Sequence, residues 1–119
     1  MQELSVVFLN KDAKNYEKFD PIDQYTAGEF QADNKIVYMV DKSGTRHIVE
    51  HTMEKLEEQL DPRQFFRLNR KFIVSIQAIQ QVKPYFNSRL KLSVLGASQQ
   101  EEMVISRDRV AEFRQWAEN

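Results

Sequence analysis

The sequence contains no cysteine, few glycines and prolines, and no long hydrophobic run. Without cysteine the chain has no disulfide, no thiolate metal site and no thiol nucleophile, which fits a reducing compartment such as the cytoplasm. Its apolar runs are far shorter than the roughly 20 residues needed to cross a bilayer. The N-terminus also lacks the basic region and cleavage site of a signal peptide. We therefore expect a cytoplasmic protein without a membrane segment.

Acidic residues are absent from one long stretch of the chain. Residues 62–100 contain no Asp or Glu and carry a formal charge of +7, whereas the rest of the chain carries −8. A basic block inside an acidic protein is a candidate footprint for a polyanion, and nucleic acid is the commonest one. On charge alone, a solvated basic face is an equally good interpretation.

Length and local patterns predict one mostly β domain over residues 1–119, with one internal helix and one C-terminal helix. No repeat, linker or low-complexity segment divides the chain. Residues 10–18 are expected to form a polar turn or hairpin, and residues 19–30 to continue in short pieces around Asp20-Pro21. The predicted strands cover residues 5–9, 36–40, 46–50, 72–74, 82–85, 89–95 and 103–105.

Residues 89–95 alternate between apolar and polar side chains, which predicts a strand with one buried face. The side chains expected inward are Leu90, Leu92 and Val94. Those expected outward are Arg89, Lys91 and Ser93.

Two segments have the period of a helix. Thr52 can cap the first, and Asp61-Pro62 ends it, because a residue before proline is pushed out of the helical region. Its apolar positions are Met53, Leu56 and Leu60. Phe65 and Phe66 are expected to anchor the following turn in the core. Residues 107–117 form the second predicted helix, whose inward positions are Val110, Phe113 and either Trp116 or Ala117.

The sequence offers no good candidate for a metal or catalytic site. Residues 47–51 (HIVEH) match the inverted zinc-protease pattern H-x-x-E-H, but that motif requires a helix. In the strand predicted here, His47 and His51 would lie roughly 13 Å apart, at about 3.3 Å per residue, too far to share one zinc ion. A nucleophile elbow and a glycine-rich phosphate loop are also lacking. We therefore expect no metal, no cofactor and no enzymatic activity.

A polar loop before the predicted strand at 72–74 holds the side chains best suited to DNA. Arg67, Asn69, Arg70 and Lys71 lie together in it. Arginine reads guanine and asparagine reads adenine through paired hydrogen bonds, and lysine suits phosphates. The alternative is that Arg67 or Arg70 pairs with a helix carboxylate, of which the candidates are Glu54, Glu57 and Asp61.

Ser106, Arg107 and Arg109 lie in a second candidate loop, where a strand ends and a helix begins. That position offers helix amide groups to a phosphate, although Ser106 is equally suited to cap the helix. The outer face of the helix at 52–60 is acidic, and DNA would repel it. Any DNA binding must therefore use loops, which excludes a helix-turn-helix protein.

Residues 56–74, LEEQLDPRQFFRLNRKFIV, strongly resemble the signature of LytTR-type (LytR/AlgR-like) DNA-binding domains, which runs roughly L-x-x-L-D-P-x-x-F-F-R. Further similarity follows at Ile79, in VKPYFNSRLKL at 82–92 and in VISR at 104–107. FQADNK at 30–35 is similar to the loop that precedes a strand in this family. Ser75 stands where the family pattern has Asn. The resemblance covers about residues 5–117.

This resemblance implies a LytTR-like arrangement of short antiparallel sheets that binds double-stranded DNA by loops in successive major grooves. Family members are typically output domains of bacterial response regulators in two-component phosphorelay systems, and they often bind as two copies on directly repeated sites. The implied partners are DNA and a receiver domain or cognate sensor system, and residues 1–119 include no receiver domain. The alternative is a protein-interaction module that kept the scaffold and lost DNA binding.

The resemblance also assigns DNA-contacting positions. Those implied to read bases or hold phosphates are Asn34, Lys35, Asn69, Arg70, Lys71, Ser106 and Arg107. Supporting or phosphate-contacting roles are implied for Arg67, Arg89 and Lys91.

Overall fold

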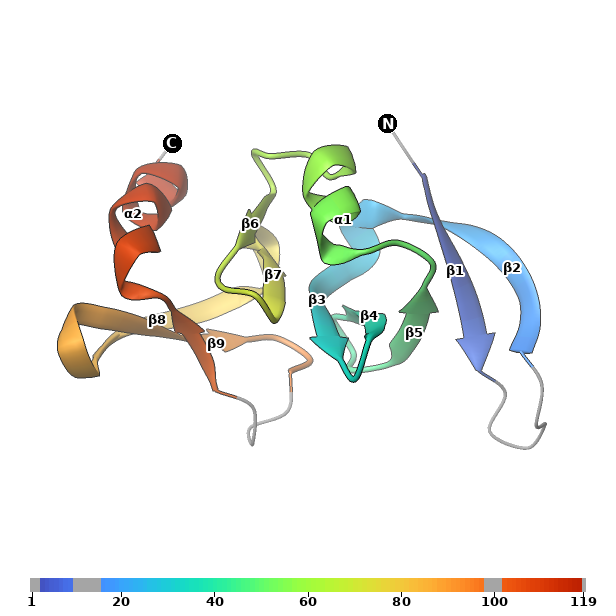
Figure 1. Cartoon of the computed structure of the whole chain (residues 1–119), viewed down its shortest axis with the longest axis horizontal. Helices are drawn as coiled ribbons and strands as arrows, with labels where there is room; N and C mark the ends of the chain where they lie inside the picture. Colours follow the sequence, from blue (N-terminus) through green and yellow to red (C-terminus); the bar gives the residue numbers. More distant parts are fainter. Residues whose placement is uncertain (1–2, 10–15, 98–101, 119) are drawn as a thin grey trace.

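The computed structural model describes residues 3–9, 16–97 and 102–118, with side chains from Tyr25 onward (Figure 1). Within these ranges the strands form two antiparallel sheets. The larger, sheet A, has in spatial order β2 (Tyr16–Asp23), β1 (Glu3–Leu9), β5 (Arg46–Val49), β4 (Ile36–Asp41), β3 (Ala27–Asp33), β7 (Phe72–Ser75) and β6 (Phe65–Arg67). The smaller, sheet B, has β10 (Met103–Ile105), β9 (Arg89–Val94) and β8 (Ile79–Tyr85). This mostly β architecture confirms the predicted fold class.

The described residues include the two predicted helices, α1 (Met53–Gln59) and α2 (Val110–Glu118). Short 3-10 turns lie between other elements. They are η1 (Gln24–Thr26), η2 (Ile76–Ala78), η3 (Phe86–Ser88) and η4 (Arg107–Arg109). Neither helix is long and apolar enough to span a membrane, which holds for the described parts of the chain.

Helix α1 begins and ends as its sequence predicts. The Oγ1 atom of Thr52 accepts a hydrogen bond of 3.1 Å from the N–H of Lys55, and so satisfies one of the free amides of the first turn. Leu60 is already extended, immediately before Asp61-Pro62. The buried side chains of Met53, Leu56 and Leu60 pack on sheet A with Phe30, Phe65 and Ile73.

Strand β7 joins two hydrophobic cores, since all four of its residues are buried. Ile73 faces the core beneath α1. Phe72 and Val74, whose side chains point to the opposite side of the strand, belong to the core formed with sheet B and α2. The loop that precedes β7 is therefore held between the two halves of the fold.

Sheet B has one buried and one open face, as the alternation in residues 89–95 predicts. Leu90, Leu92 and Val94 are buried in a core with Phe113 of α2. Helix α2 lies over this face in Figure 1. The outward side chains of β9, Arg89 and Lys91, are paired in register with Tyr85 and Lys83 of β8.

Two glycine-containing turns, one from each sheet, contact each other through their backbones. Gly44, after β4, has φ +95°, and Gly96, after β9, has φ +84°. A Cβ atom at Gly96 would lie 2.5 Å from the carbonyl oxygen of Asp41, so only glycine fits there. The close backbone contact fixes the end of β4 against the end of β9.

Several predicted boundaries were wrong. Strand β2 runs without a break through Asp20-Pro21, and η1 and β3 cover the rest of residues 19–30. Residues 16–18 of the expected polar turn belong to β2, and its residues 10–15 lie outside the described residues. Phe65 and Phe66 are buried, which confirms that they anchor this segment in the core, but they lie in strand β6 and not in a turn. The C-terminal α-helix starts at Val110, because Arg107–Arg109 forms a 3-10 turn. Of the two inward candidates near its end, Trp116 is partly buried and Ala117 is exposed.

Candidate nucleic-acid interface

Loops from three distant parts of the sequence meet around one open groove of about 870 Å³. They are the β3–β4 turn, the loop between β6 and β7, and the segment that joins β10 to η4. The start of α1 forms the remaining wall. Among the predicted DNA-contacting residues, those that line the groove are Lys35, Arg67, Asn69, Arg70 and Ser106. The fold thus brings together residues that no local sequence pattern connects.

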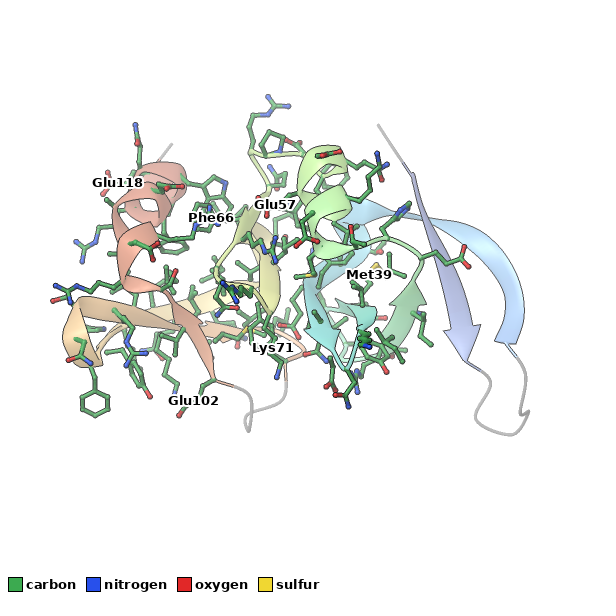
Figure 2. All side chains as sticks on the ribbon, viewed as in Figure 1. Met39, Glu57, Phe66, Lys71, Glu102 and Glu118 are labelled. Carbon is green, nitrogen blue, oxygen red and sulfur yellow. The ribbon has the colours of Figure 1, made fainter. Side chains whose placement is uncertain are left out.

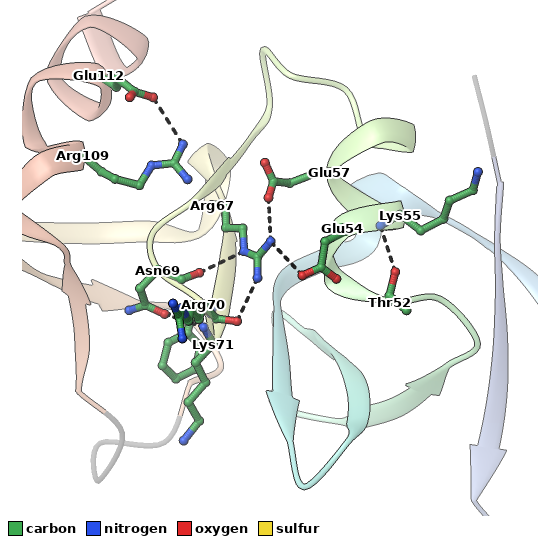
Figure 3. A network of polar contacts seen from close by, with 11 residues as sticks. Thr52, Glu54, Lys55, Glu57, Arg67, Asn69, Arg70, Lys71, Arg109 and Glu112 are labelled. Carbon is green, nitrogen blue, oxygen red and sulfur yellow. Dashed lines mark hydrogen bonds and ion pairs between the residues drawn. The ribbon is translucent and has the colours of Figure 1, made fainter.

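Arg67 holds the loop between β6 and β7 in place (Figure 3). Its Nη1 atom lies 2.7 Å from Oε1 of Glu57 and 3.6 Å from Oε1 of Glu54. Its Nε and Nη2 atoms donate to the backbone carbonyls of Asn69, at 3.0 Å, and Arg70, at 3.1 Å. The side chain is only 13% exposed. Arg67 therefore forms the ion pair with α1 that was the alternative to a DNA contact, and it also supports the backbone of the loop.

Asn69 fastens the same loop to both neighbouring strands. Its Oδ1 atom accepts from the N–H groups of Lys71, at 2.7 Å, and Phe72, at 3.1 Å. Its Nδ2 atom donates to the carbonyl of Val104 in β10, at 2.7 Å. Paired hydrogen bonds from this amide to an adenine would have to replace these contacts. Sequence analysis missed this anchoring role, although asparagine just before a strand commonly bonds to the backbone two residues on.

Ser106 links the second loop to the first. Its N–H and Oγ groups both lie near the carbonyl oxygen of Leu68, at 3.4 and 3.5 Å. Ser106 is the N-cap residue of the following 3-10 turn, as expected, and its carbonyl accepts from the N–H of Arg109 at 2.9 Å, but its side chain makes no capping hydrogen bond. Leu68 is fully buried and its N–H donates to the carbonyl of Phe72, at 2.9 Å. The two loops consequently share one rigid base.

Three exposed cationic side chains belong to these two loops. Arg70, Lys71 and Arg107 are all exposed. In the β3–β4 turn, Asn34 and Lys35 are exposed and have φ values of 49° and 69°. Such left-handed residues form a tight turn, which projects this pair beside the groove.

Arg109 is a further groove residue outside the set of predicted contacts. Its guanidinium lies 4.9 Å from the ring centre of Phe66, and Nη2 lies 3.3 Å from Glu112. The acidic face of the helix was expected, but its place in the groove wall, where Glu54 and Glu57 lie, was not. Both findings depend on helix positions that become neighbours only after folding.

Arg89 and Lys91 lie apart from the groove, on the open face of sheet B. The Nζ atom of Lys91 is 3.9 Å from Oε1 of Glu102, and Tyr85 donates a hydrogen bond of 3.1 Å to Oε2 of the same carboxylate. That bond raises the pKa of Tyr85 above its ordinary value. In Figure 2, Glu102 and Lys71 lie on the lower side of the molecule, whereas Glu118 of α2 lies on the upper side.

Of the two histidines expected in a strand, only one lies in it. His47 lies in β5, is buried, and has Nε2 3.3 Å from Oδ2 of Asp41. His51 follows the end of that strand. Across the described residues, no cluster of three or more His, Asp or Glu side chains has the arrangement of a metal site.

Together the groove and the fold define a β-rich domain that presents basic loops on one face. A sequence model of the LytTR family, described as the LytTr DNA-binding domain, matches residues 22–118. The chain belongs to this family of DNA-binding domains, which confirms the resemblance in its sequence.

Structural comparison gives the same fold. The chain is similar to a solved LytTr DNA-binding domain from Bacillus cereus, part of a protein described as a methyl-accepting/DNA response regulator. The TM-score is 0.73 at 20% sequence identity, with 95% of each chain covered. A comparison with curated protein sequences found no similar protein.

Proposed function

We propose that this protein binds double-stranded DNA sequence-specifically through its loops, as the output domain of a bacterial transcriptional regulator in a two-component system. The observation that carries the proposal is the convergence of three loops on one groove, which Lys35 and Arg70 line, while the exposed Arg107 stands in the chain between the lining residues Ser106 and Asp108. Membership in a DNA-binding family supports it. The description of the similar Bacillus cereus protein as a response regulator supports the regulatory context.

Within this proposal the predicted residues have three roles. Arg70, Arg107 and the pair Asn34 and Lys35 read base edges in the major groove. Phosphates are held by Lys71, Arg89 and Lys91. Loop positioning belongs to Arg67, Asn69 and Ser106, whose polar groups contact protein atoms.

The proposal extends to partners and location. Two copies occupy directly repeated half-sites, and a receiver domain or a cognate sensor system controls them. The protein acts in the cytoplasm, needs no cofactor and catalyses no reaction.

A protein-interaction module is the second candidate, and the acidic wall of the groove favours it. Glu54 and Glu57 line the groove beside the predicted reading loop. Their charges would repel a DNA backbone. However, both carboxylates lie near Arg67, which offsets part of this charge.

A binding series at increasing salt separates the two candidates. Duplexes selected from a random pool are compared with scrambled duplexes by gel shift. For DNA binding, log K falls linearly with log salt, by about 0.9 for each phosphate contact. Lys71→Ala should reduce the slope by about 1 without changing the preferred sequence. If no duplex binds at low salt, the proposed function is wrong and the interaction module remains.

A further inference from the structure

The hairpin formed by β8 and β9 ends in an exposed aromatic side chain. Phe86 is 73% exposed, the highest fraction among the large hydrophobic residues that the structure describes. The hairpin projects at the left end of the molecule in Figure 1, away from sheet A. An exposed phenyl ring at such a tip serves no purpose in the hydrophobic core.

The tip that carries Phe86 has a defined conformation. Asn87 and Ser88 both have positive φ values, 57° and 60°. The carbonyl of Phe86 accepts from the backbone N–H of Arg89 and from its Nε atom, the latter at 3.0 Å. The ring of Phe86 packs edge-on against that of Tyr85, with 5.0 Å between centres. The backbone of the tip is therefore fixed, and one side of the ring rests on Tyr85 while most of it stays exposed.

The surroundings of this ring are cationic. Tyr85 and Arg89 are paired in register, as are Lys83 and Lys91 one step further along the hairpin. The guanidinium of Arg89 lies 5.1 Å from the ring centre of Tyr85. These side chains occupy the face of sheet B opposite α2, since Leu90 and Leu92 point toward α2. Glu102, which contacts Tyr85 and Lys91, offsets part of this charge. Because three cations, Lys83, Arg89 and Lys91, stand against this one carboxylate, a polyanion complements the face better than an apolar protein surface does.

We propose that Phe86 is a further DNA contact and acts as an apolar wedge against a base step at one end of the bound site. This inference rests on the proposed function. Apolar wedges of this kind enter the minor groove, partly unstack one step and bend the duplex. Lys83 and Arg89 hold the phosphates on either side of the step. Because the ring makes no hydrogen bond to a base, its contribution is affinity and bending.

The test compares Phe86→Ala with Val82→Ala on a selected duplex. Val82 is also exposed, but it pairs with Leu92 and so belongs to the opposite face of sheet B. Phe86→Ala should weaken binding roughly 10-fold, within the range for loss of one base–aromatic contact. It should also reduce DNA bending, measured by energy transfer between labelled ends, and leave the salt slope unchanged. Val82→Ala should match wild type, and all three proteins should melt at the same temperature.

The outcomes separate this inference from the proposed function. If wild type shows salt-dependent binding and Phe86→Ala binds and bends DNA equally well, the wedge is wrong and the DNA-binding function stands. If Phe86→Ala weakens binding only to duplexes with two half-sites, the ring contacts a second copy of the chain, which also overturns the wedge. If wild type binds no duplex, both proposals fail together.

Discussion

Oε1 of Glu57 lies 2.7 Å from Nη1 of Arg67, and the same guanidinium holds the carbonyls of Asn69 and Arg70. An acidic side chain of α1 is thus connected to the backbone of the loop proposed to read DNA. Its negative charge opposes DNA over long distances, while its hydrogen bond to Arg67 orders the loop. These two effects have opposite signs, so a substitution can measure which one is larger.

Glu57→Gln should weaken binding to a selected duplex although it removes a negative charge. The change replaces a charge-assisted hydrogen bond with a weaker neutral one, and we expect it to cost about 1 kcal/mol of folding stability. Glu58→Gln is the matched control, since Glu58 is exposed on the same helix and pairs only loosely with Lys55, at 3.6 Å. Affinity measurements at fixed salt compare the two variants. An equal rise in affinity for both would show that the carboxylates only repel DNA.

Arg70→Ala should cost about 1–3 kcal/mol of binding free energy on the selected site, if Arg70 reads a base. Its side chain is exposed beside the groove while its backbone is fixed by Arg67. Binding to random DNA should change little. Arg114→Ala removes one positive charge from the exposed face of α2 and serves as control. A loss of the same size on every duplex would identify Arg70 as a phosphate contact.

Structural features were predictable from the sequence when the residues that signal them lie close together in the chain. The alternation of Leu90, Leu92 and Val94 gave the buried face of β9, and Thr52 and Pro62 gave the limits of α1. Both signals lie within one element. For Arg67 the sequence left several candidate carboxylates open, because it does not show which of them faces the loop.

The groove itself was beyond prediction from local patterns. Lys35, Arg70 and Ser106 come from segments whose meeting depends on β7 lying between two cores. The anchoring of Asn69 to Val104 likewise depends on β10 passing beside the loop. The family resemblance indicated that these segments contact DNA together. Composition and hydrophobic periodicity indicated only the separate helices, strands and loops.

Phe66→Ala should destabilise the fold by about 3–5 kcal/mol. Phe66 is 9% exposed, and its ring centre lies 5.6 Å from that of Phe113 and 5.2 Å from that of Trp116. Its loss opens a cavity in the core beneath α2 and removes the surface on which Arg109 rests. Urea unfolding measures the change. Phe86→Ala, at an exposed position, should leave the midpoint unchanged, and a near-neutral Phe66→Ala would contradict the burial described.

Asp61→Asn should lower stability near neutral pH and have less effect in acid. The pKa of Asp61 is held below its ordinary value, chiefly by the backbone N–H of Arg63 and also by the hydroxyl of Tyr25, which donate at 2.9 Å each. A carboxylate with a lowered pKa in the folded state contributes stability above its unfolded pKa, and loses it as pH falls through the folded value. The difference between wild type and variant, from urea unfolding at several pH values, should therefore be full at pH 6 and shrink below about pH 4.

The Asp61→Asn variant should still lose stability in acid, because Asp41 remains. Burial raises the pKa of Asp41, but hydrogen bonds from the Ser43 hydroxyl, the Thr45 N–H and His47 outweigh burial and lower it overall. Tyr25→Phe removes one of the donors to Asp61 and should reproduce part of the same pH dependence. A wild-type-to-variant difference that stays constant from pH 6 to pH 3 would show that Asp61 acts through packing at the end of α1, and that its charge adds nothing.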